Sequence, residues 1–302
     1  MESNIINTLN KDVNPKHHNV NPKYRFAKAL RPFSFPVALV TCGLGVAAAL
    51  QVQTVNSLSV LLVLLAGLLL QAGVNLINDH ADLKNPISQR LLTPIDAKQI
   101  TFNYQIGWLC FAVCSMIGLY LSYQTSPFLL ILAIIGGLGA LFYTTEPIHY
   151  KRRGLGVVLV FFLMGVLMVY GACFAITGHH YSHALIVSIP VSFLTSALLL
   201  SNELRDYASD QQEGLKTLTV RWGLHIGKKL YAVLIACSFI SMAIIVTSNQ
   251  LWVASLIFIP SVIMAIAATH LSATKGNLKD LPPMTGRLYL VFGLSEIIFL
   301  LV

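Results

Sequence analysis

Two short segments concentrate side chains that could bind a metal ion. The first, NLINDHADLKN, runs from Asn75 to Asn85, and the second, SNELRDYASDQQEGLKTLTVRWG, runs from Ser201 to Gly223. Residues four apart share one face of a helix. The pairs and triplets with this spacing are Asn75 with Asp79, Asn78 with Asp82, and Asn202 with Asp206 and Asp210. Each segment is therefore predicted to present a polar stripe that carries two carboxylates.

Carboxylates one helical turn apart repel each other, and removal from water near a membrane raises that cost. A divalent cation offsets the repulsion. Magnesium prefers hard oxygen ligands and commonly uses one or two carboxylates together with phosphate oxygens of a substrate. The competing interpretation is that each stripe is only a solvated helix end. The matching Asn-x-x-x-Asp spacing, with basic residues beside both stripes, favours a site where Mg2+ holds a diphosphate.

The composition places both segments in a membrane protein. Of the 302 residues, 56% are apolar and 11% are charged, which is more hydrophobic surface than a soluble core can bury. The net charge of +8 is explained by membrane topology and anionic lipid, so nucleic-acid binding is not expected. Residues 1–24 are polar and lack the apolar core of a signal peptide. We expect a disordered cytoplasmic tail there, followed by one transmembrane domain over residues 25–302.

Nine apolar runs are close to the length of about 20 residues that crosses a bilayer as a helix. Because such runs are too long for barrel strands, they predict an all-α integral membrane protein with nine transmembrane helices. The predicted spans are 34–51, 57–77, 102–122, 127–144, 155–177, 182–202, 229–247, 251–271 and 286–302.

The distribution of charge gives these helices an orientation. All 20 Lys and Arg residues lie in the N-terminal segment, in the loops after the second, fourth, sixth and eighth spans, or within the first two residues of the span that follows such a loop. By the positive-inside rule, the N-terminus and these loops face the cytoplasm. Eleven of the 12 acidic residues lie on the same side, although the rule does not require it, and the exception is Glu296 in the ninth span. Both carboxylate stripes are thus expected at cytoplasmic ends of helices.

The two segments resemble the aspartate motifs of the UbiA superfamily of intramembrane prenyltransferases. The second segment looks most like the branch that prenylates 1,4-dihydroxy-2-naphthoate in menaquinone synthesis. Three further segments agree with that branch: the dipeptide Arg31-Pro32, FYTTEPIHYKRRGLG from Phe142 to Gly156, and LPPMTGRLYLVFG from Leu281 to Gly293. The resemblance implies helices around a central cavity, in a bacterial inner membrane with the active-site loops in the cytoplasm.

The resemblance also implies a reaction and a set of site residues. A polyprenyl diphosphate would ionise to an allylic cation that alkylates an aromatic acceptor, with loss of the carboxylate if the acceptor is the naphthoate. Asp79, Asp82, Asp206 and Asp210 would hold Mg2+ on the diphosphate, and basic side chains would neutralise the leaving group in a dry pocket. The residues expected to bind the diphosphate are Asn75, Asn78, Lys84, Tyr143, Lys151, Arg152, Asn202, Arg205 and Lys216.

One departure from the family pattern leaves the acceptor open. The first motif of the family usually has a further Asp four or six residues beyond Asp82, where this chain has Pro86 and Ser88. The alternative acceptor is 4-hydroxybenzoate. Two other classes of protein remain as alternatives, a secondary transporter, which also carries intramembrane acids, and a non-catalytic isoprenoid-binding protein.

Other polar residues have both functional and structural interpretations. Tyr143 and Tyr150 could place an aromatic ring near the cation, or they could be ordinary tyrosines of the membrane interface. Arg221 could bind the diphosphate or serve as an orientation signal. Glu296, as an acid inside a predicted transmembrane helix, is a candidate functional residue.

Overall fold

The computed structural model describes residues 19–302 except 85–88, 91, 144–147, 149 and 275–277, and all regular structure in these residues is helical. The longer helices are α3 (Phe35–Leu50), α4 (Ser57–Asn78), α6 (Pro94–Gln124), α7 (Phe128–Leu141), α9 (Leu167–Thr177), α10 (Ser182–Arg205), α13 (Leu224–Asn249), α14 (Ile259–Ala273) and α15 (Leu281–Leu301). The short elements are η1 (Pro22–Tyr24), α2 (Phe26–Ala29), η2 (Pro32–Ser34), η3 (Asp79–Leu83), η4 (Tyr150–Arg153), α8 (Gly156–Val160), η5 (Phe161–Val166), α11 (Tyr207–Gln212), α12 (Leu218–Trp222) and η6 (Ala254–Phe258).

Eight helical stretches within the described residues are long and apolar enough to cross a membrane. A further apolar helix, α7, matches the predicted span 127–144 but has 14 residues, which at 1.5 Å per residue reach about 21 Å, less than the hydrocarbon core. Outward-facing apolar side chains such as Leu61, Met116 and Ile240 are 60–61% exposed in the chain by itself. The chain is a multi-pass membrane protein, so these side chains face lipid.

Several predicted boundaries were wrong by a few residues. The third span begins at Pro94 rather than at 102, because Thr93 and Asp96 form a capping box in which each side chain accepts a hydrogen bond from the backbone N–H of the other. The predicted tail ends before residue 24, because Pro22–Tyr24 form the short helix η1 and Tyr24 is buried against the bundle.

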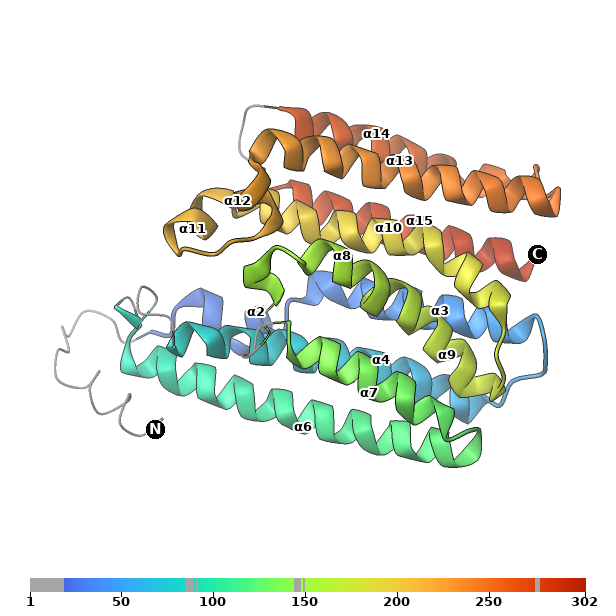
Figure 1. The fold of residues 1–302 in the computed structure, drawn as a ribbon, viewed down its shortest axis with the longest axis horizontal. Helices are drawn as coiled ribbons and strands as arrows, with labels where there is room; N and C mark the ends of the chain where they lie inside the picture. Colours follow the sequence, from blue (N-terminus) through green and yellow to red (C-terminus); the bar gives the residue numbers. More distant parts are fainter. Residues whose placement is uncertain (1–18, 85–88, 91, 144–147, 149, 275–277) are drawn as a thin grey trace.

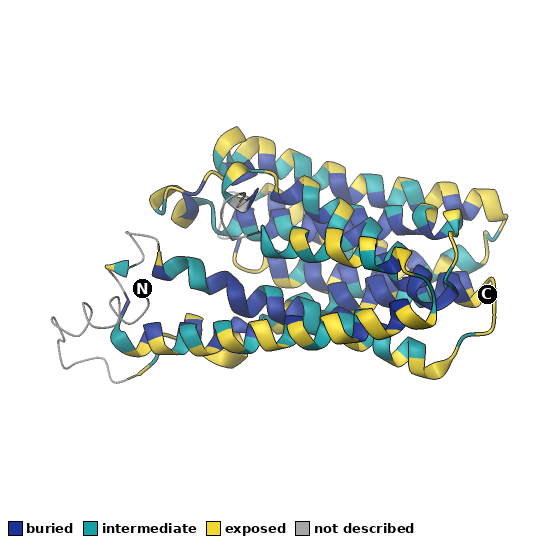
Figure 2. Cartoon of the chain, turned by 60° about the horizontal axis from the view of Figure 1, so that its bottom comes forward, coloured by how far each residue is buried: buried dark blue, intermediate teal, exposed yellow. Residues whose placement is uncertain are grey.

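The long helices run side by side, and α10 lies in their interior (Figure 1). It packs against α3, α13, α15 and η5. Dark blue buried residues line the inward faces, whereas outward faces are exposed (Figure 2). Gly165 of η5 makes one of these contacts possible, because a Cβ at this position would lie 2.1 Å from Ser192 Oγ. The short elements α2, α11 and α12 lie at one end of the bundle (Figure 1).

Candidate active site

A cavity of about 1400 Å3 extends into the bundle from the end that carries both acidic segments. Its mouth is polar and includes Lys23, Lys28, Arg31, Asn75, Asn78, Asp79, Asp82, Arg152, Asn202, Glu203, Arg205, Asp206, Asp210 and Glu213. Its body is apolar and includes Val63, Leu70, Phe111, Leu119, Leu129, Leu132, Leu163, Met164, Leu167, Met168 and Leu199. The arrangement suits a ligand with a charged head and a long apolar tail.

The first acidic segment reaches the cavity from the end of α4. The α-helix ends at Asn78, and Asp79–Leu83 continue as the 3-10 helix η3. Residues three apart eclipse in a 3-10 helix, so Asp79 and Asp82 share one face, and both line the cavity. Asp79 is buried, with 4% of its side chain exposed, whereas Asp82 is 16% exposed.

The second acidic segment comes from the end of α10 and from α11. The predicted stripe is interrupted at Asp206, where the backbone leaves the helical conformation (φ −92°, ψ 7°) between the two helices. The Asp210 N–H still donates to the Asp206 carbonyl at 2.8 Å, so the spacing of one turn is kept. Asn202, Asp206 and Asp210 therefore line the same cavity as the first segment.

Three of the aspartates are held by side chains that the sequence did not single out for binding. Arg31 donates to Asp79 Oδ1 at 2.8 Å. Lys23 donates to Asp82 Oδ2 at 2.7 Å, and the Tyr24 hydroxyl donates to the same oxygen at 3.1 Å. Burial lowers the pKa of Lys23, but the Asp82 carboxylate outweighs it, so the net pKa lies above its ordinary value. Thr217 donates to Asp210 Oδ2 at 3.3 Å.

The predicted basic residues divide into two groups. Arg152 and Arg205 line the cavity, and Arg205 makes a two-pronged contact with Asp206, with N–O distances of 2.6 and 2.7 Å. Lys84 and Lys216 are exposed and do not line the cavity. Arg221 donates to the Lys216 carbonyl and also lies outside the cavity lining. The Lys151 side chain and positions 86 and 88 lie outside the described part of the structure.

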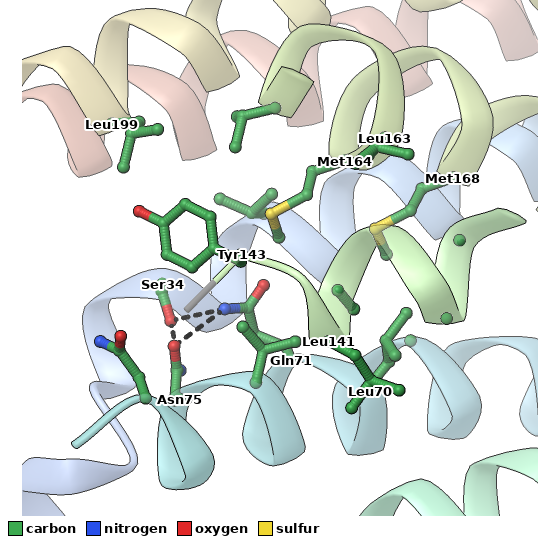
Figure 3. A pocket seen from close by; sticks show the side chains of 18 of the residues that line it. Ser34, Leu70, Gln71, Asn75, Leu141, Tyr143, Leu163, Met164, Met168 and Leu199 are labelled. Carbon is green, nitrogen blue, oxygen red and sulfur yellow. Dashed lines mark hydrogen bonds between the residues drawn. The ribbon is translucent and has the colours of Figure 1, made fainter. Parts of the chain in front are cut away.

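A hydrogen-bonded cluster on the cavity wall fixes Asn75, which was expected to bind the diphosphate. Asn75 Nδ2 donates to the Leu30 carbonyl at 2.7 Å and to Ser34 Oγ at 2.8 Å. Gln71 Nε2 donates to Ser34 Oγ at 3.1 Å and to Asn75 Oδ1 at 3.2 Å. Figure 3 shows the contacts among Ser34, Gln71 and Asn75, beside Tyr143. Both N–H groups of Asn75 thus hold the entry to α3 next to Arg31, rather than pointing at a ligand.

Tyr143 and Tyr150 lie together at the cavity, with ring centroids 5.2 Å apart. The Tyr150 hydroxyl donates to the Gly139 carbonyl at 2.5 Å, and Figure 3 shows Tyr143 among the side chains that line the cavity. Burial raises the pKa of the Tyr143 hydroxyl, so the group keeps its proton at neutral pH. Both tyrosines are therefore part of the cavity wall.

The donor set fits magnesium. Five basic and six acidic side chains line the cavity, so its formal charge of −1 would repel a diphosphate without a cation. Both α4 and α10 present their C-terminal, electronegative ends here, which also favours a cation. Asn202 Oδ1 is buried without a hydrogen-bond donor within the described residues. Among the described residues, no group of three or more His, Cys, Asp or Glu is placed to hold a metal ion by itself, so Mg2+ here would need phosphate oxygens of the substrate as further ligands.

Comparison with known proteins agrees with this architecture. The sequence profile of the UbiA prenyltransferase family matches residues 38–290. UbiA prenyltransferase domain-containing protein 1 of Mus musculus is 31% identical over 89% of this chain and 81% of that protein. The 1,4-dihydroxy-2-naphthoate octaprenyltransferase of Bacillus subtilis is 25% identical over 69% of this chain and 68% of that protein.

The fold is also similar to a solved structure. A UbiA homolog from Archaeoglobus fulgidus, bound to GPP and Mg2+, has a TM-score of 0.63 at 16% identity and covers 90% of this chain and 99% of its own. The resemblance predicted from the two acidic motifs is confirmed at the level of the family. The chain belongs to the UbiA prenyltransferase family.

Proposed function

We propose that this protein transfers a polyprenyl group from a polyprenyl diphosphate to an aromatic acceptor, with 1,4-dihydroxy-2-naphthoate as the acceptor. The observation that carries the proposal is that the ends of α4 and α10 place four aspartates at the mouth of one cavity with a long apolar body. A soluble diphosphate would not need the apolar body, and an isoprenoid without a diphosphate would not need the charged mouth.

The apolar body fits the prenyl tail. Val63 and Asn78 both line the cavity and are 15 residues apart on α4, so the cavity extends for about 22 Å along this helix. Three lining glycines, Gly118, Gly137 and Gly171, face open space, because a Cβ at any of them would meet no atom within 4 Å. Glycine inside a helix costs about 1 kcal/mol relative to alanine. Three glycines at the cavity wall are therefore consistent with a cavity whose width matters for binding.

The diphosphate would lie at the mouth, between the two acidic segments. Mg2+ held by Asp79, Asp82, Asp206 and Asp210 would supply positive charge that stabilises the diphosphate as it leaves. The Archaeoglobus relative, whose structure contains GPP and Mg2+, supports this assignment. Arg31, Lys23, Arg152 and Arg205 line the same mouth and would hold the carboxylates in place and share the remaining phosphate charge.

The reaction would break the C–O bond between the prenyl chain and the diphosphate, and the electron pair would leave with the diphosphate. An aromatic carbon of the acceptor then forms the new C–C bond with the allylic cation. In the naphthoate, the carboxylate leaves as CO2 and its electron pair restores the aromatic ring, which gives the hydroquinone form of demethylmenaquinone. The apolar wall excludes water from the cation, and the protonated Tyr143 presents a neutral ring rather than a phenolate nucleophile.

Two observations favour the naphthoate over 4-hydroxybenzoate as the acceptor. The second acidic segment is similar to the naphthoate branch, and the Bacillus subtilis relative is named as a 1,4-dihydroxy-2-naphthoate octaprenyltransferase. The relatives include vertebrate as well as bacterial proteins, so they do not support the expected bacterial inner membrane. We propose only that the site faces the cytoplasm.

The experiment is turnover by the purified protein with Mg2+, radiolabelled polyprenyl diphosphate and a panel of aromatic acids. We expect product with the naphthoate and none in Asp206→Ala or Asp210→Ala, whereas Asp280→Ala, an exposed acid outside the cavity, should behave as wild type. An acceptor labelled in its carboxyl group should lose the label on reaction. If none of the acceptors supports turnover, a transporter or a binding protein is favoured instead. A product that retains the carboxyl label would exclude the naphthoate route.

A further inference from the structure

A buried pair of threonines lies directly behind the Asp210 carboxylate. Thr217 and Thr219 are both 0% exposed and neither lines the cavity, whereas Asp210 does. Thr217 Oγ1 donates to Asp210 Oδ2 at 3.3 Å, and the two threonine hydroxyl oxygens are 3.3 Å apart. Thr217 therefore contacts a proposed metal ligand, although it lies outside the cavity that would hold the metal and the substrate.

Glu203 anchors the threonine pair to α10. The Thr219 N–H donates to Glu203 Oε2 at 3.2 Å, and the Thr219 hydroxyl oxygen lies 3.3 Å from the Glu203 carbonyl oxygen. The N–H groups in the first turn of a helix have no partner within that helix, so the Glu203 carboxylate also satisfies a backbone donor of α12. The contacts thus join α10, α11 and α12, which lie next to one another at one end of the bundle (Figure 1).

A turn at Gly214 brings the chain back from Asp210 to Thr217. The Leu215 N–H donates to the Asp210 carbonyl at 2.8 Å. Gly214 has a φ of 69°, in the left-handed region that glycine adopts without a steric penalty. Thr217 then precedes the first residue of α12. The backbone itself therefore specifies where the Thr217 hydroxyl lies.

The chemistry of the two groups determines what this contact does. An ionised carboxylate only accepts hydrogen bonds, so Thr217 is the donor to Asp210, and the Thr217 oxygen can still accept from Thr219. A neutral hydroxyl orients the carboxylate without cancelling its charge. A metal ligand requires both of these properties, a fixed orientation and a retained negative charge.

We propose that Thr217 is a positioning residue that holds Asp210 in the orientation in which it binds Mg2+, and that Thr219 and Glu203 hold Thr217 in turn. The inference rests on the proposed function and adds the residues that support one of its metal ligands. Hydrogen-bond partners of metal ligands typically contribute about 10- to 100-fold to metal affinity. Removal of the Thr217 hydroxyl should therefore weaken Mg2+ binding although every metal ligand is retained.

The test titrates Mg2+ into each protein in the presence of a non-reactive prenyl diphosphate analogue, and calorimetry gives the Mg2+ concentration at half-maximal binding. Thr217→Val keeps the shape of the side chain and should raise this concentration by about 10- to 100-fold. Thr217→Ser keeps the hydroxyl and should stay close to the wild type. Thr41→Val is the matched control, because Thr41 is also fully buried outside the cavity lining and donates to the Val37 carbonyl of its own helix.

Thr217→Ala decides the matter if Thr217→Val does not fold, because it differs from Thr217→Ser by a single oxygen atom. Thermal unfolding without Mg2+ shows which variants are folded. An unchanged Mg2+ requirement in the variant without the hydroxyl would overturn the inference. An equal rise in Thr217→Ser would also overturn it, because the loss would then follow from packing of the methyl group.

The wild type is titrated first, so that failure of the proposed function is distinguished from failure of this inference. A wild type that binds the analogue equally well without Mg2+ overturns both. Binding that depends on Mg2+ in the wild type, with the same Mg2+ requirement in the Thr217 variants, overturns the inference alone.

Discussion

The Arg31 guanidinium donates to the buried Asp79 carboxylate at 2.8 Å and thereby ties the N-terminal segment to the end of α4. The Asn78 amide, with its oxygen turned toward Arg31, accepts from the same guanidinium. Arg31 has a left-handed backbone (φ 50°, ψ 64°), which is uncommon for a residue other than glycine. The two contacts and the Ser34 hydrogen bond to the Arg31 carbonyl hold the strained residue in place.

Replacement of Arg31 should therefore destabilise the mouth of the cavity. In Arg31→Gln, Asp79 would keep its burial and lose the charged contact with Arg31, which should lower the free energy of unfolding by about 1–3 kcal/mol and reduce turnover. Arg31→Lys should recover part of the stability, because lysine keeps the charge but not the planar fork that reaches two partners. Thermal unfolding in detergent measures both variants. Equal stability of Arg31→Gln and the wild type would contradict this account of the pair.

The start of α6 should also support the site from a distance. Asp96 accepts hydrogen bonds from Thr93 N and Oγ1 and from the Asn21 N–H at 2.8 Å, so it caps α6 and holds the segment that carries Lys23. Asp96→Ala should cost about 1–2 kcal/mol of stability and weaken the Lys23–Asp82 contact, with a fall in turnover. Asp96→Asn keeps an acceptor oxygen and should lose less. Identical losses in the two variants, measured by thermal unfolding and turnover, would show that the cap is not the cause.

The open space beside Gly137 should set the length of donor that the enzyme accepts. Gly137→Leu would fill part of the apolar body, so kcat/KM for a long polyprenyl diphosphate should fall by at least about tenfold, while that for geranyl diphosphate should change little. Gly137→Ala is the control, because its Cβ meets no atom and alanine favours the helix by about 1 kcal/mol. An equal loss for short and long donors would place the tail elsewhere.

Much of the architecture could be predicted from local features of the sequence. Apolar runs predict transmembrane helices because the bilayer leaves the backbone no other partners, and the spacing from Asn75 to Asp79 and from Asn202 to Asp210 predicts which residues share a face. The structure brings both sets to one cavity. The helix boundaries were less accurate, because capping and short 3-10 turns depend on single side chains such as Thr93.

The basic residues of the site were predicted less well. Lys84 and Lys216 are close in sequence to the acids but are exposed and do not line the cavity, whereas Lys23 reaches Asp82 from 59 residues away. Such long-range contacts depend on how the N-terminal segment folds back, which no local spacing encodes. Gln71, which donates hydrogen bonds to Ser34 and Asn75, was missed because it lies within an apolar run, although its position four residues before Asn75 places it on the same helix face.

The central claim is that both acidic segments hold one diphosphate through metal ions, and calorimetric binding of a non-reactive prenyl diphosphate analogue tests it most directly. The account predicts tight binding with Mg2+, loss of at least about tenfold in affinity with EDTA, and a similar loss in Asp79→Asn and in Asp206→Asn, the double variant adding little to either. Binding that is independent of Mg2+, or that survives either substitution unchanged, would contradict it.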